Sequence, residues 1–187
     1  MKKVLIIGAN RGIGLALAKV FLENNFQVIA TCREPSTELK NLGAEIIPGV
    51  SLDDTKSLLD LKIKVSDLDY LIHNAGILEI DSLPELQENF DFSSLEKQFF
   101  INSLGPLKIA VALSGQIKKG GKITFMSSRM GSISDNDSGG AYGYRASKAA
   151  LNTFAKSLSI DLKEKEIAVA SLHPGWVRRR GRRCWGY

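Results

Sequence analysis

The chain has 187 residues, of which 44% are hydrophobic and 24% are charged. Both fractions are ordinary for a folded globular domain, and they exclude a disordered, collagen-like or disulfide-stapled chain. Lysines and arginines outnumber aspartates and glutamates by 25 to 20, but the excess lies in residues 178–187, which hold five arginines and no acid. Because the body of the chain, 1–177, is then neutral, we expect no specific nucleic-acid partner.

We expect a cytoplasmic chain with no secretory signal and no membrane association. The apolar run that begins at Val4 is interrupted at Gly8, which is too soon for the core of a signal peptide. No stretch approaches the roughly 20 apolar residues of a membrane span. Two cysteines, Cys32 and Cys184, are too few for a disulfide framework, and together with two dispersed histidines they predict no metal site.

Short apolar runs alternate with longer amphipathic segments along the chain. In chain order, this pattern predicts a strand at 4–7, a helix at 14–23, a strand at 27–31, a short helix at 36–42, a strand at 45–47, a helix at 52–61, a strand at 69–72, a long helix at 95–113, a strand at 122–126, a long helix at 142–163 and a strand at 167–172. The alternation predicts an α/β fold, a Rossmann-type doubly wound parallel sheet with helices on both faces. The polar, glycine-rich loop at 131–140 should lie at the carboxyl end of that sheet, where ligands bind.

The first strand runs directly into a glycine-rich turn, Gly-Ala-Asn-Arg-Gly-Ile-Gly, which opens the first helix. Glycines in this context allow a tight turn and a close approach of the backbone to a pyrophosphate, and the helix N-terminus offers free N–H groups. An ordinary strand-to-helix turn is the plainer alternative. We expect the turn to bind a dinucleotide through Gly8, Asn10, Arg11, Gly12, Ile13 and Gly14.

The end of the second strand indicates which dinucleotide is bound. An acid at this place would bind the ribose hydroxyls of NAD and repel a 2′-phosphate. The chain instead reads Thr31-Cys32-Arg33, and arginine can pair with a phosphate through two hydrogen bonds. Arg11, inside the glycine turn, is expected near the same 2′-phosphate position. The sequence therefore favours NADP(H) over NAD(H), although Glu34, one residue later, keeps NAD(H) open.

A tyrosine and a lysine four residues apart suggest the chemistry. Tyr144 and Lys148 share one face of the helix expected at 142–163. A free tyrosine has a pKa of about 10, too high for efficient proton transfer near neutrality. An ammonium about 4 Å away is sufficient to lower that pKa by a few units. Tyr142 is a rival phenol, but it has no lysine four residues later.

These motifs together resemble those of the short-chain dehydrogenase/reductase family, with residues 128–148 most similar to its sniffer-like carbonyl-reductase branch. The resemblance implies sheet order 3-2-1-4-5-6 and reduction of a small-molecule carbonyl substrate by hydride from NADPH. It implies that Tyr144 donates the proton and that Lys148 lowers the tyrosine pKa and binds the nicotinamide ribose. By the same resemblance Ser128 polarises the carbonyl, although a serine here can also simply cap the next segment. Asn102 would support the proton relay.

Further segments resemble cofactor-binding motifs of the same family. His73 precedes Asn74, Ala75 and Gly76 and replaces the first asparagine of the family's Asn-Asn-Ala-Gly motif, a change we interpret as structural. The segment after the sixth strand resembles the family's Pro-Gly segment beside the nicotinamide, which assigns Pro174, Gly175 and Val177 to the cofactor. The family also implies a homodimer through the two long helices.

The resemblance ends at about residue 177. We therefore divide the chain into an NADP-binding domain with its catalytic site, 1–177, and an aberrant arginine-rich tail, 178–187. The family's usual lid and seventh strand are missing, which predicts a truncated reductase with weak turnover. An alternative is a catalytically impaired chain that binds NADP(H) or a protein partner. Another is that the tail anchors the chain to RNA or to an anionic membrane.

Overall fold

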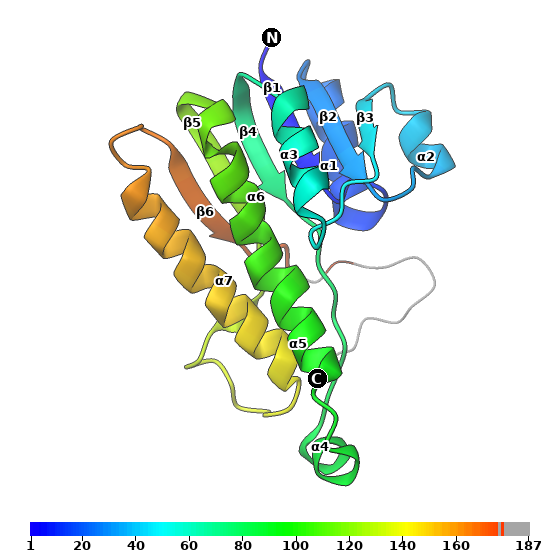
Figure 1. The fold of residues 1–187 in the computed structure, drawn as a ribbon, viewed down its shortest axis with the longest axis vertical. Helices are drawn as coiled ribbons and strands as arrows, with labels where there is room; N and C mark the ends of the chain where they lie inside the picture. Colours follow the sequence, from blue (N-terminus) through cyan, green and yellow to red (C-terminus); the bar gives the residue numbers. More distant parts are fainter. Residues whose placement is uncertain (176, 178–187) are drawn as a thin grey trace.

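The computed structural model describes residues 1–175 and 177. Its strands all pair in parallel, in the order β3-β2-β1-β4-β5-β6 (Figure 1). This confirms the predicted Rossmann-type, doubly wound sheet. The strands are β1 (Lys3–Ile7), β2 (Gln27–Cys32), β3 (Glu45–Pro48), β4 (Leu68–His73), β5 (Ile117–Met126) and β6 (Ala168–Leu172).

The helices lie close to their predicted places, with two exceptions. They are α1 (Gly12–Glu23), α2 (Thr37–Lys40), α3 (Thr55–Lys64), α4 (Leu83–Asn89), α5 (Ser93–Phe99), α6 (Gly105–Leu113) and α7 (Tyr142–Asp161). First, the long helix predicted at 95–113 is divided, because the π-helical segment η1 (Phe100–Leu104) separates α5 from α6. Second, α4 was not predicted. Its start is stabilised by a capping box in which Ser82 and Glu85 bond each other's backbone N–H.

The two faces of the sheet are covered unequally. On one face lie α3, α6 and α7 (Figure 1), which bury an apolar cluster with side chains from β1 to β5; Leu61, Ile109 and Leu151 are among its members. On the other face, α1 and α2 bury an apolar cluster with β1, β2 and β4. Over β5 and β6 this second face remains accessible: Lys122 is exposed, and its neighbour in register, Ala168, is exposed too.

The predicted tail at 178–187 lies outside the described residues. Among the residues that are described, we find no helix of the length and apolar character that crossing a membrane requires. Helix α4 has no buried residue and projects from the body of the fold (Figure 1). The segment that connects β4 to α4 passes beside α5 and α7, and its contacts there matter for the site described next.

Candidate active site

The glycine turn between β1 and α1 is anchored on both sides. Gly8 has a φ of 82° and Gly12 a φ of 57°, values that favour glycine. Thr31, on β2, accepts hydrogen bonds from the N–H groups of Gly8 and Ala9 at 3.1 and 3.0 Å. A Cβ added to Gly14 would lie 2.2 Å from the Gly8 carbonyl oxygen. The turn is therefore packed too closely for any side chain at position 14.

The end of β4 packs against this turn. The Asn74 side chain donates to the Gly8 carbonyl at 2.8 Å. Ala75 packs against Gly8 so closely that a Cβ added to Gly8 would lie 2.9 Å from atoms of Ala75. Gly76 continues toward α7: a Cβ added to it would lie 3.1 Å from Asn102 Oδ1 and 3.6 Å from Lys148 Nζ. The predicted cofactor segment thus connects the glycine turn to the predicted catalytic residues.

The predicted 2′-phosphate corner carries two exposed arginines. Asn10 orders this region, since its side-chain oxygen accepts from Ser36 N at 2.6 Å and its carbonyl accepts from Ser36 Oγ at 2.9 Å. Arg11 forms the N-cap of α1 in an extended conformation, and Ile13 is half-buried behind it. In the part of the chain that the structure describes, neither Arg11 nor Arg33 forms an ion pair. Both guanidinium groups are therefore available to an anion.

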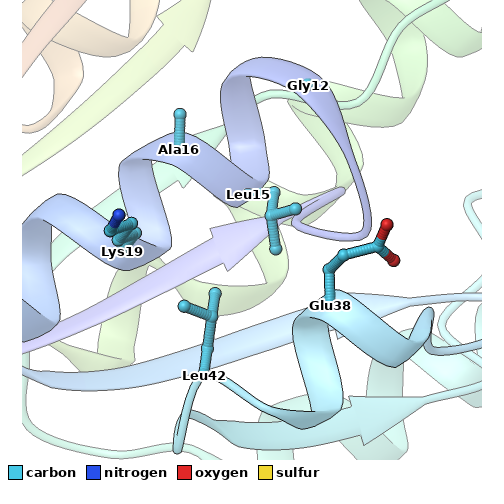
Figure 2. Close-up of a pocket in the computed structure, with 6 residues that line it drawn as sticks. All are labelled: Gly12, Leu15, Ala16, Lys19, Glu38 and Leu42. Carbon is cyan, nitrogen blue, oxygen red and sulfur yellow. The ribbon is translucent and has the colours of Figure 1, made fainter.

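A shallow cavity of about 310 Å³ adjoins the glycine turn between α1 and α2 (Figure 2). It shares Gly12 with the turn, and its floor is apolar, with Leu15 and Leu42 facing each other across it (Figure 2). Lys19 and Glu38 provide its only charges among the lining residues. None of the predicted catalytic residues lines this cavity.

His73, the last residue of β4, is buried with 2% of its surface exposed. Burial, the larger cause, and the positive charge of Lys148 together lower the pKa of its imidazole from 6.5 to about 3. Its Nε2 has no hydrogen-bond partner among the described residues. The imidazole is therefore neutral at physiological pH. This is consistent with the structural role that the sequence suggested.

Lys148 and Tyr144 meet on one face of α7. Lys148 is only 4% exposed, and its Nζ donates to the carbonyl of Met126, at the end of β5, at 2.8 Å. The same Nζ lies 5.7 Å from the centroid of the Tyr144 ring. Burial lowers the pKa of the Lys148 ammonium from 10.5 to about 8, so the group remains mostly protonated at neutral pH. The arrangement places a buried cation beside a phenol.

Asn102 lies at the centre of the π-helical segment and is fully buried. Its side-chain oxygen accepts from Ile77 N at 2.8 Å, and its amide nitrogen donates to the Ile77 carbonyl at 2.8 Å. The same nitrogen donates to Ser147 Oγ at 3.1 Å, and Ser147 in turn donates to the Tyr144 carbonyl. Single π-helical turns are frequent at functional sites. The motif search missed Ile77 and Ser147, since neither residue type signals a role by itself.

Ser128 follows β5 and opens a short 3₁₀ turn (Arg129–Gly131), in which its Oγ accepts from Met130 N at 3.2 Å. The capping alternative therefore describes a real contact, but a hydroxyl that accepts one bond still has its own proton to donate. The turn packs closely against α7, because a Cβ added to Gly131 would lie 2.8 Å from the Lys148 carbonyl carbon. The structure thus brings the segment of Ser128 to the helix of Tyr144.

The segment after β6 reaches the same end of the sheet. Ser127 N donates to the Leu172 carbonyl at 2.8 Å, which places the start of the Pro174 segment beside the residue that precedes Ser128. Pro174, Gly175 and Val177 are all exposed, and Gly175 has a φ of 73°. Trp176 lies outside the described residues. All the predicted site residues therefore come from the carboxyl ends of β1, β2, β4, β5 and β6 and from the helices beside them.

A family model described as short chain dehydrogenase matches residues 2–183. The chain is 34% identical over 181 residues to the 1-hydroxy-2-glutathionyl-2-methyl-3-butene dehydrogenase of Rhodococcus sp. (strain AD45). That alignment covers 95% of this chain and 78% of the Rhodococcus protein. The similarity therefore extends over the whole described fold.

Solved structures with similar folds include two carbonyl reductases. The carbonyl reductase Sniffer of D. melanogaster superposes with a TM-score of 0.86 at 31% identity, covering 94% of this chain and 81% of its own. A carbonyl reductase from Pseudomonas aeruginosa PAO1, solved in complex with NADP, superposes with a TM-score of 0.83 at 36% identity. It covers 95% of this chain and 84% of its own.

Proposed function

Because the chain belongs to the short-chain dehydrogenase family and is an oxidoreductase, we propose that it reduces an aldehyde or ketone to an alcohol with NADPH. The observation that carries this proposal is the buried Lys148 ammonium, bonded to the Met126 carbonyl and 5.7 Å from the Tyr144 ring. A buried lysine costs stability, and perturbed ionisable groups of this kind are concentrated at functional sites. Carbonyl reduction needs a proton donor of this kind.

The residues present fit NADP(H). Glycines with positive φ and the closely packed Gly14 leave the backbone of the turn open to a pyrophosphate, and the N-terminus of α1 lies directly behind it. Arg11 and Arg33 supply two cations for a 2′-phosphate. Relatives in the same fold support this choice, since the Pseudomonas carbonyl reductase and a Burkholderia multivorans protein were solved with NADP. NAD(H) remains the less favoured alternative.

Each residue of the site has a separate role in the transfer of the proton to the substrate. When bound, the nicotinamide supplies the hydride. Lys148 favours the phenolate form of Tyr144 by its charge, which makes the phenol a better acid at neutral pH. Tyr144 donates its proton to the carbonyl oxygen as charge develops there. Ser128 donates a hydrogen bond to the same oxygen, which stabilises that charge in the transition state. Asn102 holds the surrounding backbone and supports the relay through which the proton is replaced.

The test is the consumption of NADPH with a panel of aldehydes and ketones. We expect turnover with at least one carbonyl compound and a loss of about 10²–10⁴-fold in Tyr144→Phe, the usual contribution of general acid catalysis. Tyr142→Phe is the matched control, because it removes the rival phenol two residues earlier on the same helix. Loss of turnover in Tyr142→Phe with activity retained in Tyr144→Phe would contradict the proposed site.

Binding without turnover is the competing outcome. A chain that binds NADPH by fluorescence titration and reduces no carbonyl would be a nucleotide-binding protein with an impaired site. The observation that favours this alternative is the exposure of Lys122 and Ala168 on one face of β5 and β6, which no described helix covers. Stopped-flow mixing with NADPH and a reactive aldehyde separates slow chemistry from absent chemistry.

We further propose a homodimer through the long helices. Two large apolar side chains on these helices, Val111 of α6 and Ile160 of α7, are 60% and 59% exposed. Burying such side chains against a second copy is favourable. Sedimentation equilibrium tests this, and Val111→Asp should shift the population to monomers.

The cytoplasmic location stays a prediction, which fractionation of cells that express the chain can test.

A further inference from the structure

Helix α7 carries Tyr144 in its first turn, yet the residue at its N-cap position has no side chain that can accept a hydrogen bond from that turn. Ala141 occupies this position in a left-handed conformation, with a φ of 48°, and it makes no capping bond through its side chain. The first N–H groups of a helix have no partner within the helix and need one from elsewhere when they are buried. Ala141 and Gly143 are buried here. The start of this helix therefore depends on another part of the chain.

A single distant residue, Asp81, supplies that partner. Its backbone carbonyl accepts from Ala141 N at 2.8 Å. Its carboxylate accepts from Tyr142 N through Oδ1 at 2.5 Å and from Gly143 N through Oδ2 at 3.2 Å. Asp81 is 7% exposed. One buried acid thus binds three successive amides, and the residue that follows them is Tyr144.

Asp81 is itself held in place. It ends a segment, 77–81, that is bound at every second residue: Asn102 bonds both backbone groups of Ile77, and Gln98 accepts from Glu79 N at 3.0 Å. The helix start cannot shift toward α5, because a Cβ on Gly143 would already lie 2.8 Å from Gln98 Nε2. The start of α7 is therefore confined by α5 on one side and by the 77–81 segment on another.

We propose that Asp81 is a positioning residue for Tyr144. By binding the amides of 141–143, it fixes the rotation and height of the first turn of α7, and so it fixes the phenol relative to Lys148 one turn later. A carboxylate suits this place, since charge-assisted bonds to N–H groups are strong and the helix N-terminus attracts negative charge. Asp81 touches no reacting atom. The inference rests on the proposed function, because it concerns the orientation of the proton donor.

The first test compares Asp81→Ala with Ser82→Ala. Ser82 is the neighbouring residue, but its hydroxyl caps α4 through Glu85, and it forms no hydrogen bond to α7 among the residues that the structure describes. We expect Asp81→Ala to lower kcat by about 10–100-fold, as misplacement by about 1 Å does, while the Kd of NADPH changes less than about twofold. Asp81→Asn keeps one carboxamide oxygen for the amides and should restore part of the lost kcat. Ser82→Ala should keep kcat. An unchanged kcat in Asp81→Ala would overturn the proposal.

Combination with Tyr144→Phe separates positioning from general damage. If Asp81 acts through Tyr144, adding Asp81→Ala to Tyr144→Phe should cost no further activity, because residues that act as a unit are not additive. A further loss as large as that in the wild-type background would show that Asp81→Ala harms the fold as a whole, and it would overturn the proposal. If Asp81→Ala does not fold, Asp81→Asn replaces it in both experiments.

Amide hydrogen exchange provides a readout that needs no turnover. Asp81→Ala should speed exchange at Tyr142 and Gly143, whose amides the carboxylate binds, by about tenfold or more, the equivalent of one lost hydrogen bond to a charged group. It should leave the rest of α7 protected, and also Ala141, which the backbone carbonyl of residue 81 still binds. Equal protection in the variant and the wild type would overturn the positioning role. If the wild type reduces no carbonyl, but Asp81→Ala still shows the expected faster exchange, the proposed function is refuted and the role of Asp81 at the start of α7 stands.

Discussion

The buried histidine of β4 makes the stability of this protein depend on pH in a calculable way. His73 is 2% exposed, and its imidazole pKa lies at about 3 in the folded chain, against 6.5 without burial. Between these two pH values the unfolded chain binds a proton that the folded chain does not bind. Because the unfolded state then carries more protons, the free energy of unfolding must fall as the pH falls.

The magnitude follows from the same two values. Each pH unit below 6.5 costs about 1.4 kcal/mol while the folded imidazole stays neutral. By pH 5 the loss amounts to about 2 kcal/mol, and by pH 4 it reaches about 3 kcal/mol. Above pH 6.5 the contribution is constant. Against the 5–15 kcal/mol that stabilises a typical domain, a loss of about 3 kcal/mol is readily measured.

Urea unfolding followed by circular dichroism at pH 7, 6, 5 and about 4 is the assay. His73→Asn removes the titrating group but keeps a polar side chain, so it should lose the part of the pH dependence that His73 contributes. His173→Asn is the matched control, since it removes the chain's other histidine, which is exposed. If wild type and His73→Asn have the same slope between pH 6.5 and 4, the buried imidazole does not act as described.

Three further predictions follow from single contacts. Lys148→Met should raise the free energy of unfolding at pH 7 by about 1–3 kcal/mol, because it removes a buried charge whose pKa burial has lowered, while carbonyl turnover is lost; urea unfolding and NADPH consumption measure both. Gly14→Ala should destabilise the chain by about 1–3 kcal/mol by forcing a Cβ against the Gly8 carbonyl, and equal thermal midpoints would refute the close packing. Arg33→Ala should raise the Kd of NADPH by about tenfold or more and leave that of NADH unchanged; Arg129→Ala, which breaks an ion pair with Asp135 elsewhere, is the control for the fluorescence titration.

Local patterns located most elements of the fold. The apolar runs placed all six strands to within a residue or two, except that β5 begins at Ile117 rather than at 122. Its first residues pair across an irregular register between Leu68 and Tyr70, which no alternation of side chains reveals. The predicted helix at 52–61 begins at Thr55, because the Asp54 side chain caps it by accepting from Lys56 N.

Two features of the helices escaped the sequence analysis for different reasons. Helix α4 has a capping box that is visible in the sequence, but it has no buried face and so lacks the apolar period on which helix prediction depends. The π-helical segment within 95–113 ends just before Pro106, which has no N–H to continue the helical hydrogen bonds and marks a break that the apolar period did not reveal. Asn102, at the centre of the segment, makes three hydrogen bonds, two to Ile77 and one to Ser147, and these depend on the fold rather than on sequence neighbours.

The sequence alone predicted the type of site and the residues expected in it. The glycine turn and the Tyr144–Lys148 pair depend on neighbours in the chain, so spacing is sufficient to identify them. Only the tertiary structure decided how the pair is held. Asp81 and Met126 act through contacts made across the fold, and neither belongs to a motif. The same holds for His73, whose pKa is lowered by burial and by the charge of Lys148 on α7. Neither cause can be read from the neighbours of His73 in the sequence.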